Sequence, residues 1–149
     1  MSPVVSAALP PESVRIATNP TTEPFWQAAK ENKLVAPECS DCGTFRMPPT
    51  PFCPACTSKS IIWRELSGEA TVFSFTVVRG FPGIPDITLV PAVVDLSGAP
   101  GARLVSPLVG FDPVEVYIGM SVSVNFTPIS DGWNLPVFVP ERPDEITER

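Results

Sequence analysis

The cysteines of this 149-residue chain form two Cys-x-x-Cys pairs, the arrangement in the sequence most able to do chemistry. Cys39 and Cys42 make the first pair, and Cys53 and Cys56 make the second. Two such pairs across a short loop let four thiolates surround one metal ion tetrahedrally, at about 2.3 Å from zinc. Four protein ligands leave no position for water, so we expect a structural site, with zinc favoured over iron.

Other roles for these cysteines fit the sequence less well. Two disulfides would suit a secreted chain, but the N-terminus lacks the charged region of a signal peptide. A redox Cys-x-x-Cys motif would be single and would begin a helix after a strand. The sequence therefore predicts a metal site in a reducing, cytoplasmic compartment.

The composition limits which functions the chain can have. The sequence has no histidine, so no Ser–His or Cys–His nucleophile pair can form, and we expect no enzymatic activity from the chain by itself. The formal net charge of −6, without a basic stripe, disfavours nucleic-acid binding. No apolar run approaches the length of a membrane span. Twenty prolines disfavour long helices and favour short strands.

The first part of the chain must position the cysteines. Residues 1–18 are expected to be a flexible leader, and residues 19–60 a helix followed by a zinc ribbon. Thr21 or Thr22 is the expected N-cap of the helix. Between the Cys pairs, Arg46 is expected to be solvated. The expected small apolar core of the ribbon consists of Phe45, Met47 and Phe52.

Residues 61–140 have the pattern of a β-barrel, followed by a polar tail at 141–149. After an entry strand at 61–66, alternating apolar residues predict five strands at 69–78, 90–96, 103–109, 121–127 and 135–139. Asp112 can cap a single helical turn that Pro113 begins, between the third and fourth of these strands. This pattern matches an OB-fold. Residues 80–89 are expected to be a Gly/Pro-rich loop with exposed apolar tips.

The order of these pieces resembles that of a known family. The helix, the paired Cys-x-x-Cys motifs, the run WRELSGEATVFSFT from Trp63 to Thr76 and the run DPVEVYIGM from Asp112 to Met120 resemble the DUF35 family over residues 20–140. The resemblance implies a mainly β fold: an N-terminal helix, a rubredoxin-like zinc ribbon with four cysteine ligands and a C-terminal five-stranded OB-fold barrel. It also implies an association with acyl-CoA chemistry.

The family resemblance further implies a function. Its members support thiolase-fold enzymes or hotdog-fold hydratases, and this chain has no hotdog domain. We therefore expect a non-catalytic accessory subunit of a thiolase-like, lipid-transfer-protein-like retro-aldolase of steroid side-chain degradation, with acyl-CoA at the interface. The alternatives are a partner of a biosynthetic thiolase and a nucleic-acid-binding protein, since zinc ribbons and OB-folds are both common in the latter class.

Seven residues are candidates for contacts with the partner or with acyl-CoA. The two aromatic residues are adjacent on a short helix, which cannot bury both rings on one side. The apolar residues lie at a loop tip, which a partner would cover. The arginines are candidates because guanidinium groups bind phosphate. Each has an ordinary alternative: core packing for the aromatic residues, closure of the barrel end for the loop, and solvation for the arginines. The candidates are Phe25, Trp26, Arg79, Phe81, Pro82, Ile84 and Arg103.

Overall fold

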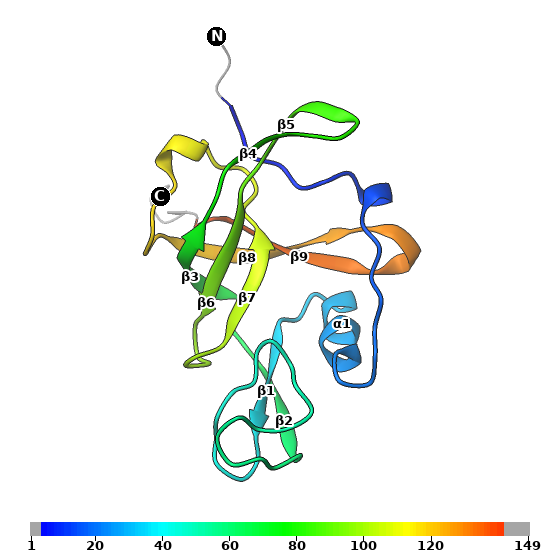
Figure 1. The fold of residues 1–149 in the computed structure, drawn as a ribbon, viewed down its shortest axis with the longest axis vertical. Helices are drawn as coiled ribbons and strands as arrows, with labels where there is room; N and C mark the ends of the chain where they lie inside the picture. The colour runs from blue at the N-terminus through cyan, green and yellow to red at the C-terminus, as the bar shows by residue number, and fades with distance from the viewer. Residues whose placement is uncertain (1–3, 142–149) are drawn as a thin grey trace, which may run out of the picture.

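Nine strands, one α-helix and three 3-10 helices make up residues 4–141, the part of the chain that the computed structural model describes (Figure 1). Within this range, no helix has the length and apolar character needed to cross a bilayer. In chain order the elements are η1 (Pro11–Ser13), α1 (Glu23–Lys30), β1 (Val35–Cys39), β2 (Ile61–Glu65), β3 (Glu69–Phe75), β4 (Val78–Phe81), β5 (Ile84–Leu89), β6 (Pro91–Leu96), β7 (Arg103–Pro107), η2 (Pro113–Glu115), β8 (Ser121–Pro128), η3 (Ser130–Gly132) and β9 (Asn134–Pro140).

Five of these strands form the barrel, which is the OB-fold domain predicted from the sequence. The strand order is β7-β6-β3-β8-β9, and all neighbouring strands are antiparallel. Beyond the end of β7, Leu108 forms a parallel bridge with Phe138 of β9, which curls the sheet so that its outer strands meet. Both residues are fully buried. The predicted helical turn is confirmed as η2, where the Asp112 carboxylate accepts a hydrogen bond from the Val114 N–H at 3.1 Å.

The predicted loop at 80–89 is instead a β-hairpin formed by β4 and β5. Arg79 pairs with Thr88, and Phe81 pairs with Ile84 across a tight turn. Gly83 in this turn has φ +84°, a backbone conformation that glycine adopts without steric cost. The prediction was wrong because glycine and proline are common in loops, whereas here they form the turn and the adjoining β-bulge. The hairpin projects from the barrel at the end opposite β1 and β2 (Figure 1).

The ribbon, residues 35–65, consists of β1, β2 and the cysteine-bearing loops between them. Val35 pairs with Glu65, and Cys39 pairs with Ile61. The entry strand that the sequence placed in the barrel region is thus β2, and its pairing partner is the ribbon strand β1.

Helix α1 lies between the ribbon and the barrel (Figure 1). Its N-terminal turn is closed by Asn19, whose side-chain oxygen accepts hydrogen bonds from the N–H groups of Thr21 and Thr22. Thr22 is the N-cap residue, one of the two predicted positions, but its side chain makes no capping hydrogen bond. At the C-terminal end, the Asn134 side-chain amide of β9 donates to the carbonyl of Ala29 at 3.1 Å.

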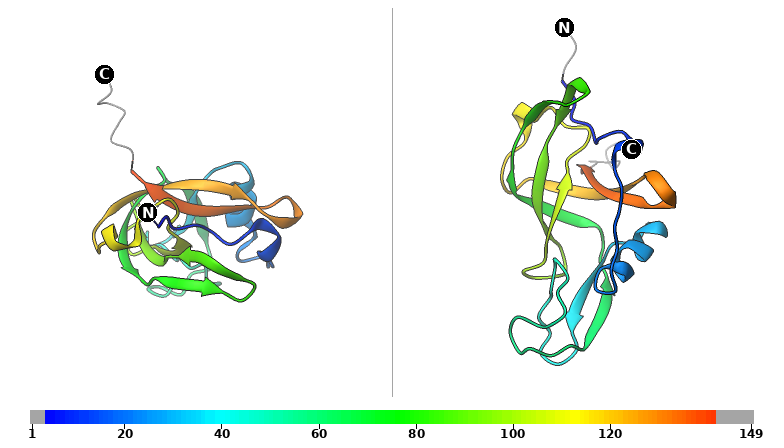
Figure 2. Two further views of the ribbon diagram at one scale, coloured as in Figure 1. Left: turned by 90° about the horizontal axis from the view of Figure 1, so that it is seen from above. Right: turned by 45° about the vertical axis from the view of Figure 1, so that its right-hand side comes forward.

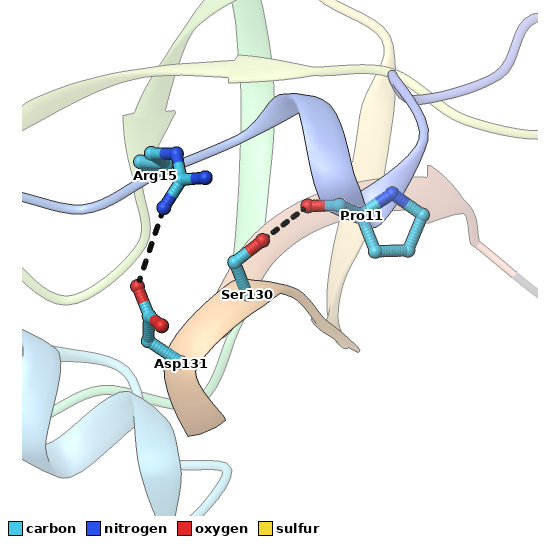
Figure 3. Close-up of polar contacts among 4 residues, drawn as sticks. All are labelled: Pro11, Arg15, Ser130 and Asp131. Atoms are coloured by element: carbon cyan, nitrogen blue, oxygen red, sulfur yellow. Dashed lines mark hydrogen bonds and ion pairs between the residues drawn. The ribbon is translucent and has the colours of Figure 1, made fainter.

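The arm, residues 4–18, runs along the barrel (Figure 2). Ser6 is buried, and its N–H donates to the Phe111 carbonyl at 2.7 Å while its carbonyl accepts from the Gly110 N–H at 2.9 Å. Farther along, the Ser130 hydroxyl donates to the Pro11 carbonyl at 3.0 Å (Figure 3). The barrel thus holds this segment at two places where a flexible leader was expected.

Candidate metal centre and contact surface

The four cysteine sulfurs lie together at the end of the ribbon. Cys39 Sγ is 3.6 Å from Cys56 Sγ, Cys42 Sγ is 3.5 Å from Cys53 Sγ, and all four atoms lie within 4.8 Å of one another. Four sulfurs at about 2.3 Å from one tetrahedral metal would lie about 3.8 Å apart. The donor set and its spacing therefore fit a four-coordinate metal, and all four thiols are free rather than joined in disulfides.

The two Cys pairs have matching backbone turns. The Cys39 carbonyl accepts from the Gly43 N–H, and the Cys53 carbonyl accepts from the Thr57 N–H, both at 2.9 Å. Gly43 has φ +82° and Thr57 has φ +65°. A left-handed backbone suits glycine but strains a β-branched residue by about 1–3 kcal/mol. Both turns need this conformation at the residue that follows the second cysteine of each pair.

The backbone of these turns favours thiolates at two cysteines. The backbone N–H groups of Cys42 and Asp41 donate to the Cys39 sulfur and lower its pKa to about 6 although the residue is buried. Burial opposes ionisation at Cys53, but the N–H groups of Cys56 and Ala55 outweigh it and lower the pKa of that thiol.

At Cys56 the balance is reversed. The Ser58 N–H favours the thiolate, but burial and the neighbouring sulfurs outweigh it and raise the pKa of Cys56 to about 12. Four thiolates this close repel one another, so the cluster can be fully ionised only around a cation.

Arg46 and Phe52 exchange the positions that the sequence predicted for them. Arg46 is only 3% exposed, whereas Phe52 is 51% exposed, with the Lys59 ammonium 5.4 Å from its ring centroid. Met47 is buried as expected, and Phe45 packs partly against the same core. The prediction for Arg46 was wrong because the acceptors of its guanidinium come from residues 50, 58 and 60, which a local pattern does not show.

The two aromatic candidates on α1 have different environments. Phe25 is 5% exposed and belongs to the core, which leaves little of its ring for contact with a partner. Trp26 packs edge-on against Phe25, with ring centroids 5.0 Å apart, and remains partly exposed. The core therefore takes one ring fully and the other in part, which leaves Trp26 as the candidate on this helix.

The hairpin presents the largest group of candidates. Phe81, Pro82 and Arg79 are exposed or half-exposed, and Ile84 is half-buried. Arg103 lies elsewhere, on β7, where its guanidinium pairs with Asp95 at 2.7 Å. Because Arg103 also stacks 3.8 Å from the Phe73 ring centroid, its charge is already partnered within the chain. The structure does not bring the seven candidates into one site.

Other surface features were not predicted. Val114, Tyr117 and Ile118, in and just after η2, are 80%, 59% and 68% exposed. The apolar run after Asp112 is visible in the sequence, but its spacing does not show which of its side chains face outward. A cleft of about 650 Å³ also lies between the ribbon and the loop from Ser97 to Pro100, and none of the seven candidates lines it.

Comparisons with known proteins identify both parts of the chain. A family model described as "ChsH2, rubredoxin-like zinc ribbon domain" matches residues 26–61, and one described as "ChsH2, C-terminal OB-fold domain" matches residues 63–127. A "DUF35 domain-containing scaffold protein" of Methanocaldococcus jannaschii is 33% identical over 110 residues, which cover 71% of this chain and 77% of the relative.

Two curated relatives are described as hydratase subunits. A "Probable enoyl-CoA hydratase alpha subunit" of Thermomonospora curvata is 39% identical over 81% of this chain. The "3-oxo-4,17-pregnadiene-20-carboxyl-CoA hydratase alpha subunit" of Mycobacterium tuberculosis is 34% identical over 89% of it. This chain spans only 38% and 42% of the lengths of these two relatives.

A solved structure shares the whole arrangement of ribbon and barrel. It is a chain of an "Ltp2-ChsH2(DUF35) aldolase" and is 36% identical to this one, with a TM-score of 0.75. The match covers 85% of this chain and 98% of the other.

Proposed function

Because this chain belongs to the DUF35 family, we propose that it is an accessory subunit of a thiolase-like acyl-CoA aldolase and has no catalytic residues of its own. The observation that carries this proposal is the likeness to the DUF35 chain of the Ltp2-ChsH2 aldolase over nearly its full length. Its role is to bind the aldolase and to border its acyl-CoA channel. The four free thiols fit a reducing cytoplasm, where we place the complex.

Chemical features of the chain support an accessory role. Its sequence lacks histidine, the commonest general base near neutral pH. The four sulfurs form a closed ligand set, which leaves a bound metal no open position for substrate. We infer that this metal is zinc and that it holds the ribbon folded.

The substrate class is proposed from the name of one relative. The hydratase subunit of M. tuberculosis is named for a pregnadiene carboxyl-CoA, which is a steroid thioester. We propose that the partner of this chain cleaves a steroid side-chain acyl-CoA by a retro-aldol reaction.

A second candidate is a scaffold for a hydratase or for a biosynthetic thiolase. The two relatives described as hydratase alpha subunits favour the hydratase, and the relative described as a scaffold protein favours a bridging role. Nucleic-acid binding is less consistent with the formal net charge of −6.

Co-expression with a thiolase-like aldolase tests the proposal. We expect the two to elute together in size-exclusion chromatography and to cleave a steroid hydroxyacyl-CoA only when both are present. Turnover by this chain alone would contradict an accessory role. Elution with a hotdog-fold hydratase, and not with the thiolase-like protein, would favour the second candidate.

A further inference from the structure

Arg46 is buried in the ribbon, and no acidic side chain within residues 4–141 pairs with it. Among the residues that the structure describes, Arg46 is the only buried residue with a charged side chain. Its guanidinium donates only to neutral carbonyls, those of Thr50 at 3.2 Å, Ser58 at 2.8 Å and Ser60 at 3.4 Å, and its Nε has no partner. Burying a charge in this way is costly unless a nearby opposite charge offsets the cost.

The carbonyls that hold Arg46 also connect to both Cys pairs. The Ser58 carbonyl accepts a hydrogen bond from the Cys53 N–H at 2.8 Å, and the Ser60 carbonyl accepts one from the Ser40 N–H at 3.0 Å. Ser40 directly follows Cys39, so each pair is tied to the segment 58–60. A single guanidinium nitrogen, Nη2, contacts both of these carbonyls.

A metal-loaded site would carry the negative charge that Arg46 lacks among its partners. A divalent cation with four thiolates carries a net charge of −2. In the interior of a protein, such a charge attracts a nearby cation more strongly than it would in water.

We infer that Arg46 is a positioning residue for the metal centre. Its hydrogen bonds hold the two Cys pairs at metal-binding spacing, and its charge offsets the negative charge of the metal–thiolate cluster. This inference rests on the metal centre proposed above and not on the aldolase partner.

The test is a titration of the full chain with Co²⁺, in which the thiolate-to-Co²⁺ absorption band reports how much metal is bound. Competition with Zn²⁺ then gives the zinc affinity. Arg46→Met removes both the guanidinium hydrogen-bond donors and the positive charge, and we expect it to weaken metal binding by about 10–100-fold. Arg46→Lys keeps a charge but offers one point donor, so its affinity should lie between those of Arg46→Met and the parent. Arg64→Met is the control, because Arg64 lies in the same ribbon but forms an exposed ion pair.

Each outcome decides a separate point. If Arg46→Met binds Co²⁺ as tightly as the parent chain, the inference is wrong. Thermal unfolding of both proteins, once with Co²⁺ and once with EDTA, gives a second check. The inference is also wrong if Arg46→Met loses the same thermal stability relative to the parent in both conditions. Arg46→Lys binding no more tightly than Arg46→Met would overturn the charge contribution. If Arg46→Met does not fold, Arg46→Lys must bind Co²⁺ more weakly than the parent, and parental binding would overturn the inference. A parent chain that binds no Co²⁺ would contradict the metal centre itself.

Discussion

Gly43 and Thr57 set the backbone conformation of the two cysteine-bearing turns of the ribbon. The left-handed turns at Gly43 and Thr57 aim two sulfurs from each pair at one point, and Thr57 adopts this conformation despite its branched side chain. The hydrogen bonds that close these turns cannot by themselves overcome the repulsion among four thiolates. We therefore expect the ribbon to depend on a bound metal, because binding energy at such a site is also folding energy.

Cys39→Ser tests this dependence. We expect the variant to lose its metal and the amides of residues 39–56 to lose protection from hydrogen exchange, while those of β8 and β9 stay protected. Elemental analysis and exchange mass spectrometry measure the two effects. Ser40→Ala is the control, since its side chain is exposed and is not a sulfur ligand. Full metal content in Cys39→Ser would show that the cluster is not the metal site.

Two glycines separate backbone strain from steric clash. Gly68 and Gly119 have similar backbone angles, with φ +96° and +94°. A Cβ added at Gly68 would lie 2.7 Å from Val124 Cγ1, whereas a Cβ added at Gly119 would have no atom within 4 Å. We expect Gly119→Ala to lower the free energy of unfolding by about 1 kcal/mol and Gly68→Ala by about 2–3 kcal/mol. Urea denaturation measures both. Equal losses would mean that Val124 moves aside without cost.

At the level of elements, the arm extends the barrel beyond its five strands. Ser6 joins the arm to the segment before η2 through two backbone hydrogen bonds, and its hydroxyl accepts a third from the Phe111 N–H at 3.0 Å. The contact between Arg15 and Asp131, at 3.9 Å and mostly exposed, contributes little by comparison (Figure 3). The buried end of the arm is therefore its main attachment.

Ser6→Ala tests this attachment. The change leaves the buried Phe111 N–H without its side-chain acceptor, which should cost about 1–3 kcal/mol. We expect faster hydrogen exchange at the Phe111 amide and a lower unfolding midpoint. Ser13→Ala, at an exposed position of the same arm, should change neither. Unaltered exchange at Phe111 would show that the hydroxyl does not secure the arm.

Over the whole molecule, the cysteine cluster lies apart from the exposed apolar side chains of the β4–β5 hairpin and η2, although Phe52 is also exposed within the ribbon. The ribbon occupies one end, and the β4–β5 hairpin and η2 occupy the other half (Figures 1 and 2). Phe81 is exposed in the hairpin, as are Val114, Tyr117 and Ile118 at η2. Because a partner would bury such side chains, we propose this half of the barrel as the aldolase contact.

Phe81→Ser is the matching experiment. We expect it to weaken co-purification with the aldolase by about tenfold or more while the unfolding midpoint stays unchanged. Val105→Ser is the control, because Val105 is 72% exposed but lies on β7, away from the hairpin tip. If Val105→Ser weakens the complex and Phe81→Ser does not, the contact lies on another face of the barrel.

The sequence by itself determined the parts whose physics is local. Cysteine spacing predicted the metal cluster, alternation predicted five barrel strands, and Asp112 with Pro113 predicted η2. In each case the signal is the spacing of nearby residues or a pattern that repeats along a strand, even though the two Cys pairs themselves meet across 11 to 17 residues. A single sequence therefore contained the fold class and the four sulfur ligands.

Only the tertiary structure decided which side chains are buried and what holds them. Arg46 finds acceptors up to 14 residues away, and Ser6 finds its donor 105 residues away, at Phe111. Phe25 and Trp26 are adjacent, and the packing of α1 against β1 and β9 decides which ring enters the core. Such partners meet only after the ribbon and the barrel have formed, because burial and hydrogen bonding depend on distant segments rather than on neighbours in the sequence.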